Sequence, residues 1–332
     1  GDTSSPTCLL IRVLPVFRFA DCKLTDQHCE IVASALQSSN SPLRDLDLSN
    51  NDLQDSGVEL LCAGLKSPNC QLNILRLCGC NLTDQCCEIV ASTLQSSKSL
   101  LRDLDLSDNK LQDSGVKLLF DAFLTPTCQL NILSVDHGGE LMISRLHKYA
   151  VDLTLDPNTA HTDLALSEEN RKVTRVRESQ SYPDHPERFD EWEQVLCGES
   201  LTGRCYWEAE WSGDHVCISV SYKGIKRKGM SRDCVFGHNQ KSWSLFCSDH
   251  RFSVRHNSNS TAVSAGSGSC KRVGVCVDVS AGTLSFYSVS DTHTLTHLHT
   301  FTHTFTEPLY AGFRLNYVNS SVSLCHIKHT HT

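Results

Sequence analysis

Two short stretches of the sequence contain residue types that carry chemistry in enzymes. His185-Pro186-Glu187 has the H-x-E form of the zinc deaminases, in which a histidine ligates zinc and a glutamate transfers protons. The chain has no P-C-x-x-C to supply the remaining zinc ligands. Gly266-Ser267-Gly268 lacks the third glycine and the flanking strand and helix of a dinucleotide-binding loop. Neither pattern is complete enough to predict an active site.

A third stretch concentrates histidines near the C-terminus. His293, His297, His299 and His303 share one parity, so a strand would present them on one face, as a set of metal ligands requires. The tract HTLTHLHTFTHT is also a simple alternation of threonine and histidine, and such low complexity favours a loop or tail without a metal. G-x-S-x-G, H-E-x-x-H and Walker A sequences are absent. We therefore expect no catalytic residues, no metal site, no cofactor in this chain and no enzyme activity.

The composition is that of a globular chain, and it narrows the range of partners. The 332 residues are 39% hydrophobic and 20% charged, which is enough for two domains with separate cores. The net charge of −8 argues against a general nucleic-acid binder, whose signature is an excess of basic residues. No apolar run approaches the roughly 18 residues that a membrane span needs. We expect neither nucleic acid nor membrane as a specific partner.

The first part of the sequence repeats itself. LRDLDLSNNDLQDSGV at residues 43–58 returns as LRDLDLSDNKLQDSGV at residues 101–116. A shorter period of 29 residues lies inside this repeat, with similar units that begin at Leu24, Leu53, Leu82 and Leu111. Self-similarity at a fixed period predicts stacked units that cannot bury a core alone. Proteins built in this way are usually binding surfaces, so the repeat favours binding over catalysis.

Each unit reads L-x-x-L-x-L-x-x-N/C, with copies that start at Leu14, Leu43, Leu72 and Leu101 and an incomplete one at Leu130. The alternating leucines predict a short strand with one buried face, followed by a helix. The pattern resembles the ribonuclease-inhibitor type of leucine-rich repeat, which implies an α/β solenoid with a concave strand face. The first strand would leave an open sheet edge, so we expect further repeats upstream of residue 1.

Two kinds of residue are expected where the strands and helices of the repeats begin or end. Asp55 is predicted to cap the helix that follows its strand, and Thr25/Asp26 and Thr83/Asp84 are predicted to cap the helices of the alternate units. Cys22 and Cys80 occupy the position that Asn51 and Asn109 occupy in the other units, a buried turn position that accepts Asn or Cys in leucine-rich repeats.

The 18 cysteines of the chain are predicted to be reduced structural thiols. No C-x-x-C pair is present, and buried cysteine packs as a small hydrophobic residue. Reduced cysteines place the chain in the cytosol.

One row of charged residues is expected on the concave face of the repeats. Arg18, Asp47, Arg76 and Asp105 lie 29 residues apart and would sit on neighbouring parallel strands, about 4.8 Å from one another. Cross-strand ion pairing that fixes the register of the strands is the favoured interpretation. A charged groove that binds a partner is the alternative, so these four residues are candidate partner-binding residues.

The second part of the sequence reads as an antiparallel β-sandwich, because short strand-like runs alternate with turn residues. The runs are Val216–Tyr222, Lys241–Cys247, Val273–Val279, Gly282–Val289 and Leu309–Leu315. Five segments in the same region resemble the motifs of a PRY-SPRY (B30.2) domain, in the order of that family: LDPNTAH (155–161), YPDHPERFD (182–190), GRCYWEAE (203–210), DVSAGTLSFYSV (278–289) and EPLYAGF (307–313). Within them, Trp207 and Phe286 are expected in the core and Gly282 in a tight turn.

This resemblance implies protein binding through loops at one end of the sandwich. The contact positions of the antibody-binding tripartite-motif relative correspond to Cys217, Phe246, Ser248 and Phe313. Two of these positions are aromatic or charged in that relative, so a different ligand is expected here. A basic run in a loop is interpreted as a solvated surface, with attraction of an acidic ligand as the alternative. The run comprises Lys223, Lys226, Arg227, Lys228 and Arg232.

The predicted order is leucine-rich repeats over residues 1–137, a linker at 138–154, the PRY-SPRY domain at 155–327 and a tail at 328–332. This order resembles the C-terminal half of the fish-type NOD-like receptor family. The resemblance implies a cytosolic innate-immune sensor that binds a protein or microbial ligand through the PRY-SPRY loops and the concave repeat face. ATP or ADP is expected only on a NACHT module upstream of this chain. A substrate-recruiting arm of a tripartite-motif ubiquitin ligase is the alternative.

Overall fold

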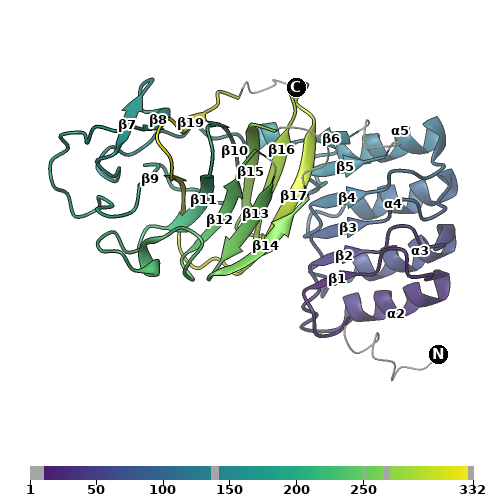
Figure 1. Cartoon of the computed structure of the whole chain (residues 1–332). Helices are drawn as coiled ribbons and strands as arrows, with labels where there is room; N and C mark the ends of the chain where they lie inside the picture. Colours follow the sequence, from purple (N-terminus) through teal and green to yellow (C-terminus); the bar gives the residue numbers. More distant parts are fainter. Residues whose placement is uncertain (1–10, 136–141, 250, 265–269, 328–332) are drawn as a thin grey trace. The chain divides into compact units, whose positions relative to one another are not determined.

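A computed structural model describes residues 11–135, 142–249, 251–264 and 270–327 of the chain. The chain divides into two compact units, residues 1–145 and residues 146–332, which are described separately (Figure 1). Gly266-Ser267-Gly268, the N-terminal residues and the predicted tail lie outside the described residues.

In unit 1, short strands alternate with helices. The strands are β1 (Val16–Arg18), β2 (Asp45–Asp47), β3 (Ile74–Arg76), β4 (Asp103–Asp105), β5 (Ile132–Ser134) and β6 (Met142–Ser144). The helices are α2 (Asp26–Gln37), α3 (Gln54–Leu65), α4 (Cys87–Leu94), which follows the 3-10 turn Asp84–Cys86, and α5 (Gln112–Phe123). The strands β1 to β5 pair in parallel in sequence order, and β6 pairs with β5 in the antiparallel sense.

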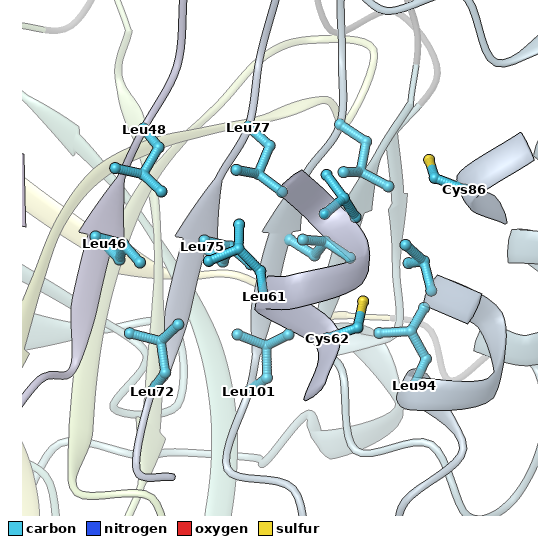
Figure 2. Packing of buried hydrophobic residues seen from close by; sticks show 14 of the residues in the cluster. Leu46, Leu48, Leu61, Cys62, Leu72, Leu75, Leu77, Cys86, Leu94 and Leu101 are labelled. Carbon is cyan, nitrogen blue, oxygen red and sulfur yellow. The ribbon is translucent and has the colours of Figure 1, made fainter. Parts of the chain in front are cut away.

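The leucines of the repeat consensus form the core of unit 1. Leu46, Leu75 and Leu104 lie at the same register position on β2, β3 and β4, and each is fully buried. Helix residues such as Leu61 and Cys62 pack against this row (Figure 2). The predicted sharing of one core by stacked units is therefore confirmed, because every unit adds leucines to a core that it shares with its neighbours.

Buried asparagines connect one repeat to the next. The Asn109 side-chain amide donates to the carbonyls of Leu77, Leu106 and Ser107, while its Oδ1 accepts from the backbone N–H groups of Cys80 and Leu82. Asn51 makes the equivalent bonds one pair of units earlier.

The two cysteines at the asparagine position differ. Cys80 is buried and its thiol donates to the carbonyl of Leu48, as the prediction requires. Cys22 is exposed, so the prediction of a buried turn residue is wrong there.

Two of the three predicted helix caps are confirmed. Thr25 is the N-cap residue of α2, and Thr83 caps the 3-10 turn by accepting from the backbone N–H of Gln85. Asp55 lies inside the first turn of α3 rather than at its N-cap. Its carboxylate instead accepts hydrogen bonds from the backbone and hydroxyl of Thr83. The predicted cap is therefore wrong, because the acidic side chain serves the next repeat instead of its own helix.

Unit 2 is built from two antiparallel sheets. The first is ordered β17-β16-β15-β10-β19-β8-β7 and the second β14-β13-β12-β11-β18-β9. The strands of the first sheet are β7 (Leu164–Ser167), β8 (Lys172–Arg175), β10 (Arg204–Ser212), β15 (Arg272–Asp278), β16 (Thr283–Val289), β17 (Leu295–Thr302) and β19 (Ser321–Leu324). Those of the second sheet are β9 (Gln194–Leu196), β11 (Val216–Tyr222), β12 (Ser242–Cys247), β13 (Phe252–His256), β14 (Asn259–Val263) and β18 (Leu309–Leu315). All five predicted strands are confirmed, within one residue at either end. Two 3-10 turns, Leu146–Tyr149 and Arg232–Cys234, complete the unit.

The two sheets share one apolar core, to which alternate residues of each strand contribute. Trp207 on β10 packs edge-on against Phe313 on β18, with their ring centroids 5.8 Å apart. Trp207 and Phe286 are both buried, which confirms their predicted core role. Gly282 has φ +70 in the turn after β15, and a Cβ there would lie 2.6 Å from the carbonyl oxygen of His303. The predicted turn role of Gly282 is therefore confirmed as well.

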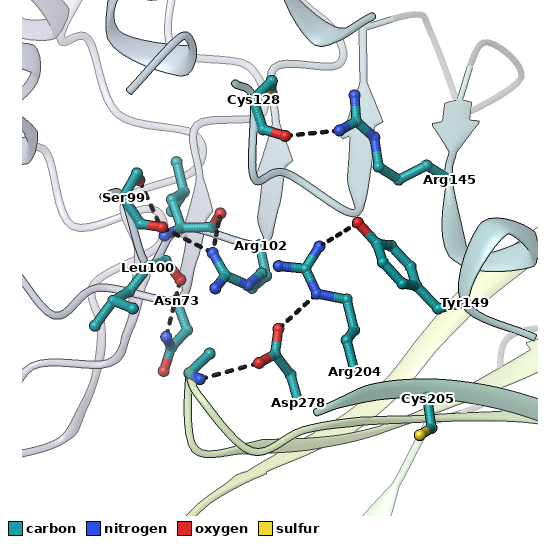
Figure 3. A network of polar contacts seen from close by, with 12 residues as sticks. Asn73, Ser99, Leu100, Arg102, Cys128, Arg145, Tyr149, Arg204, Cys205 and Asp278 are labelled. Carbon is teal, nitrogen blue, oxygen red and sulfur yellow. Dashed lines mark hydrogen bonds and ion pairs between the residues drawn. The ribbon is translucent and has the colours of Figure 1, made fainter. Parts of the chain in front are cut away.

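A buried ion pair joins β10 to the turn between β15 and β16. Arg204 on β10 contacts Asp278 at 2.9 Å and donates a hydrogen bond to the Tyr149 hydroxyl at 3.1 Å (Figure 3). The second carboxylate oxygen of Asp278 accepts from the backbone N–H of Ala281 at 3.0 Å.

The histidine-rich tract is a strand. Residues Leu295–Thr302 form β17, which pairs with β16 around a bulge at Phe286 and Tyr287. The expectation of a loop or tail is therefore wrong for this tract, because Leu295 and Leu298 enter the core and the alternation of threonine and histidine fits an edge strand.

In the part of the chain that the structure describes, every helix is too short or too polar to cross a membrane.

Candidate functional site

A cavity of about 440 Å³ opens on the face of the second sheet that points away from the shared core. Four neighbouring strands, β11 to β14, and the adjacent β18 contribute side chains to it. The lining consists of Cys217, Phe236, His238, Ser244, Phe246, Arg251, Phe252, Ser253, Arg255, Ser260, Ala262 and Arg314. No carboxylate is among these residues.

The register of the strands explains why this face is hollow. One rung crosses the sheet as Arg314, Cys217, Phe246, Ser253 and Ala262, each paired with the next. A second rung crosses the sheet as Ser219, Ser244, Arg255 and Ser260, each paired with the next. Small side chains thus stand beside large ones in both rungs: Cys217 and Ser253 flank Phe246, and Ser244 and Ser260 flank Arg255. The cavity follows from this alternation of small and large residues on one face of the sheet.

One wall of the cavity belongs to a loop that is fixed from below. Phe236 is buried and packs edge-on against Phe189, with ring centroids 5.7 Å apart. Gln194 on β9, fully buried, donates to the carbonyl of Cys234 at 2.6 Å and accepts from the backbone N–H of Phe236 at 2.9 Å. Because the loop is anchored by these buried bonds, the wall is preformed.

The structure separates the four contact positions carried over from the tripartite-motif relative. Cys217 and Phe246 lie side by side on the first rung and line the cavity. Ser248 lies in the turn after β12, where its hydroxyl donates to the carbonyl of Arg251. Phe313 points into the core and is fully buried, so it offers a partner no surface. The neighbouring residue on β18, Arg314, faces the cavity in its place.

Sequence reasoning missed the charged residues of this cavity. Arg255 donates to the His238 ring at 3.1 Å, and His238 faces three arginines in all. Burial, together with the positive charges of Arg255, Arg314 and Arg232, lowers the pKa of His238 to about 4. His238 is therefore neutral at pH 7 and adds no positive charge to the site.

Two residues of the basic run, Arg227 and Lys228, form hydrogen bonds that hold loops together. Arg227 donates to the carbonyls of Ile225, Glu187 and Lys223, and its guanidinium lies over the ring of Phe189. Lys228 donates to the carbonyl of His185. The predicted solvated surface is therefore wrong for Arg227, which is buried, because its guanidinium is used to hold backbone carbonyls of the loops.

Three residues elsewhere in unit 2 have ligand atoms close enough together to hold a metal ion: His161, Asp163 and Glu193, all within 4.8 Å of one another. Arg175 already places a positive charge there, at 3.8 Å from Asp163 and 3.2 Å from Glu193. An ion would have to compete with this guanidinium, so the cluster is accounted for as an ion-pair network.

The charged row on the repeats has the predicted register, and a further carboxylate pairs with its arginines. Arg18, Asp47, Arg76 and Asp105 are direct neighbours across β1 to β4. Asp45, a buried residue two positions before Asp47, forms ion pairs with two arginines of the row, at 3.4 Å from Arg18 and 3.1 Å from Arg76.

A second row of carboxylates completes this cluster. Asp103 on β4 is buried, and burial raises its pKa to about 6, against the opposing effect of Arg76. Burial lowers the pKa of Arg76, but the carboxylates of Asp103, Asp45, Asp47 and Asp105 more than reverse this effect and raise it above the usual value. Arg76 is thus held within the sheet by several carboxylates, which fits the interpretation of the row as a register-fixing structure.

Comparisons with known families agree with this architecture. Residues 153–201 match the SPRY-associated domain PRY, and residues 204–327 match the SPRY domain. Residues 39–62 and 97–120 match leucine-rich repeats.

Individual relatives match about half of the chain. Stonustoxin subunit beta of Synanceia horrida is 43% identical over 179 residues, which are 54% of this chain and 25% of the toxin subunit. Tripartite motif-containing protein 16 of Mus musculus is 38% identical over 180 residues, 53% of this chain and 32% of that protein. The chain thus spans between a quarter and a third of the length of these two relatives.

Solved structures give the same result. The crystal structure of the TRIM65 PSpry domain is 30% identical with a TM-score of 0.50, and the match covers 55% of this chain and 93% of that domain. The stonustoxin structure is 27% identical with a TM-score of 0.51, over 64% of this chain and 41% of the toxin chain. This chain therefore carries leucine-rich repeats followed by a PRY-SPRY domain, a domain of the protein-binding type.

Proposed function

We propose that the chain is the non-catalytic, ligand-binding and autoregulatory region of a cytosolic innate-immune NOD-like receptor. The preformed cavity on the β11–β14 face carries this proposal, because it is a concave site with both apolar and polar walls. The ligand is a protein or microbial component, and the concave repeat face assists in binding or regulation. Binding shifts the receptor between a closed and an open state, provided that the ligand has different affinities for the two.

The chemistry of the cavity supports recognition rather than catalysis. The Ser219 hydroxyl donates to the Ser244 hydroxyl at 2.8 Å, and the Cys217 sulfur lies 3.4 Å from the Arg314 guanidinium. These potential nucleophiles therefore contact groups that do not act as general bases. The cysteines in the described part of the chain are all free thiols, which supports a cytosolic location.

The binding proposal is tested by filling the cavity. Ser260 and Thr261 are adjacent, exposed residues of β14, but only Ser260 lines the cavity. A random-peptide phage library is selected on the full chain and then assayed on Ser260→Trp and on the control Thr261→Trp. We expect selected peptides that lose binding to Ser260→Trp and keep it on Thr261→Trp. Equal binding to both variants would refute the cavity as the binding site.

A substrate-recognition arm of a tripartite-motif ubiquitin ligase is the alternative, favoured by the similarity to mouse Tripartite motif-containing protein 16 and to E3 ubiquitin-protein ligase TRIM11 of Rattus norvegicus. The two proposals differ in what precedes the repeats. Sequencing the transcript upstream of residue 1 distinguishes them. A Walker A sequence of a NACHT module supports the receptor, whereas the paired cysteines of a RING domain support the ligase.

A further inference from the structure

Two arginines of the cavity, Arg255 and Arg314, have neither a carboxylate partner nor the set of backbone carbonyl acceptors that holds the buried Arg227. Arg314 donates to the amide oxygen of Asn316 and to the Cys217 sulfur, and its Nε is buried without a partner. Arg255 contacts the ring of His238. Among the described residues, neither guanidinium has a carboxylate within ion-pair distance. By contrast, Arg204, Arg175 and Arg272 each pair with an aspartate or glutamate.

These charges converge on one part of the cavity. Arg255 and Arg314 stand on β13 and β18, yet both line the same cavity, together with the His238 ring that Arg255 contacts at 3.1 Å. Arg251 adds a third positive charge at the exposed side of the lining. Positive charge in a recess without an internal counter-charge raises the local concentration of anions, and a guanidinium binds a carboxylate through paired hydrogen bonds.

An aromatic ladder continues from the cavity toward the surface. The ring of Phe246, in the cavity lining, stacks on His215 at 5.3 Å, and His215 lies 4.8 Å from the ring of Tyr317. Tyr317 is 53% exposed, and Nδ1 of His215 is buried without a hydrogen-bond partner. The carboxylate at this edge, Asp214, is 3.4 Å from Nε2 of His215 and lies outside the cavity lining. Such a ladder gives an apolar side chain of a ligand a surface on which to pack.

We propose that the cavity binds an acidic segment of a polypeptide partner, with carboxylates against Arg255 and Arg314 and an apolar side chain against Phe246, His215 and Tyr317. This inference rests on the proposed function, because it specifies the ligand of the same cavity. Carboxylates are chosen because they are the anionic groups that a polypeptide carries without modification.

The test uses the cavity-dependent peptides from the phage selection, synthesised with a fluorescent label, and the full chain. For each peptide a matched version replaces every glutamate and aspartate by glutamine and asparagine. We expect acidic residues to be enriched over the input library, and the neutral versions to bind about tenfold more weakly or worse in fluorescence anisotropy. Raising the salt concentration should weaken the acidic peptides only.

Arginine variants locate the effect. Arg255→Gln and Arg314→Gln should each weaken the acidic peptide about tenfold, whereas Arg177→Gln, which removes an exposed arginine outside the cavity, should not. If Arg314→Gln loses its cooperative melt, Arg251→Gln replaces it, because Arg251 is exposed and its removal leaves no buried gap. Cavity-dependent peptides that show no acidic enrichment and bind the arginine variants normally would overturn this inference and leave the proposed function intact. Absence of any cavity-dependent peptide would overturn both.

Discussion

Asp103 is a carboxyl group that the repeat sheet holds at an energetic cost. It lies on β4, is buried, and shares its surroundings with Asp45 and Asp105, whose charges add to the effect of burial in raising its pKa. Arg76 opposes this shift without cancelling it, so the pKa rises from 3.8 to about 6. The native state thus keeps a proton on Asp103 at pH values where the unfolded chain has lost it.

This shift predicts the direction of a pH effect. A native pKa above the unfolded pKa gives stability that is fully present below pH 3.8 and is lost as pH rises through about 6. The Asp103→Asn variant cannot titrate, so its free energy of unfolding relative to the natural chain should rise by about 1–3 kcal/mol over that window. Urea unfolding of unit 1 at several pH values measures the difference. For the exposed Asp121→Asn control on α5 the difference should stay flat, and an equally flat difference for Asp103→Asn would contradict the shift.

At the scale of elements, buried asparagine side chains join each repeat to its neighbour. Asn109 satisfies five backbone groups in two consecutive units, so one side chain connects β3, β4 and the turns that follow them. Cys80 takes the same position one unit earlier with a single thiol donor to Leu48, a weaker version of the same connection. The repeats therefore alternate between strongly and weakly bonded turns.

Removing this side chain should destabilise unit 1 substantially. Asn109→Ala leaves buried backbone donors and acceptors without partners, at an expected cost of about 2–4 kcal/mol in urea unfolding. Asn109→Cys should cost less, because the thiol restores one bond, as it does at Cys80. The control Asn69→Ala removes one exposed bond to the Gln37 carbonyl and should cost less than about 1 kcal/mol. Equal losses for Asn109→Ala and Asn69→Ala would show that the connection between repeats is not limiting.

Periodicity in the sequence predicted most elements but only part of the cavity. The 29-residue period located the repeat strands, and alternation located the sandwich strands, because both patterns record which side chains face a core. On β18 the same alternation sends Phe313 into the core and Arg314 to the opposite face. The carried-over contact position misses this, because a position copied from a relative does not account for the direction of the side chain.

The rungs of the cavity could not be predicted from any single strand. Arg255 and Arg314 become neighbours of one space only through the pairing of β18, β11, β12 and β13, which come from separate parts of the chain. The lack of a carboxylate near these two arginines is likewise a property of the assembled β11–β14 face and cannot be predicted from one strand. The alternation of serine with apolar residues on β11 and β12 was the available signal, since small polar side chains on a buried face mark a hollow or a covered surface.

At the scale of the whole molecule, the two matched families in unit 2 behave as one structure. The PRY segment supplies β8, which pairs with β19 of the first sheet, and β9, which pairs with β18 of the second. It also contributes Leu153, Leu155 and Leu164 to the core between the sheets. Each sheet therefore contains strands from both families, and the wall at Phe236 depends on Gln194 of β9.

This interdependence predicts where the chain can be divided. A chain of residues 146–332 keeps the whole core of unit 2 and should melt in one cooperative transition, with the fluorescence of buried Trp207, Trp211 and Trp243. A chain of residues 204–332 retains the SPRY match but loses β7, β8 and β9. Their loss exposes one edge of each sheet, at β19 and at β18, and part of the core. It should bind a hydrophobic dye and lack a cooperative melt. A native melt of the shorter chain would mean that the PRY segment is dispensable for folding. Its effect on peptide binding would then isolate the contribution of Gln194 and the Phe236 wall to the cavity.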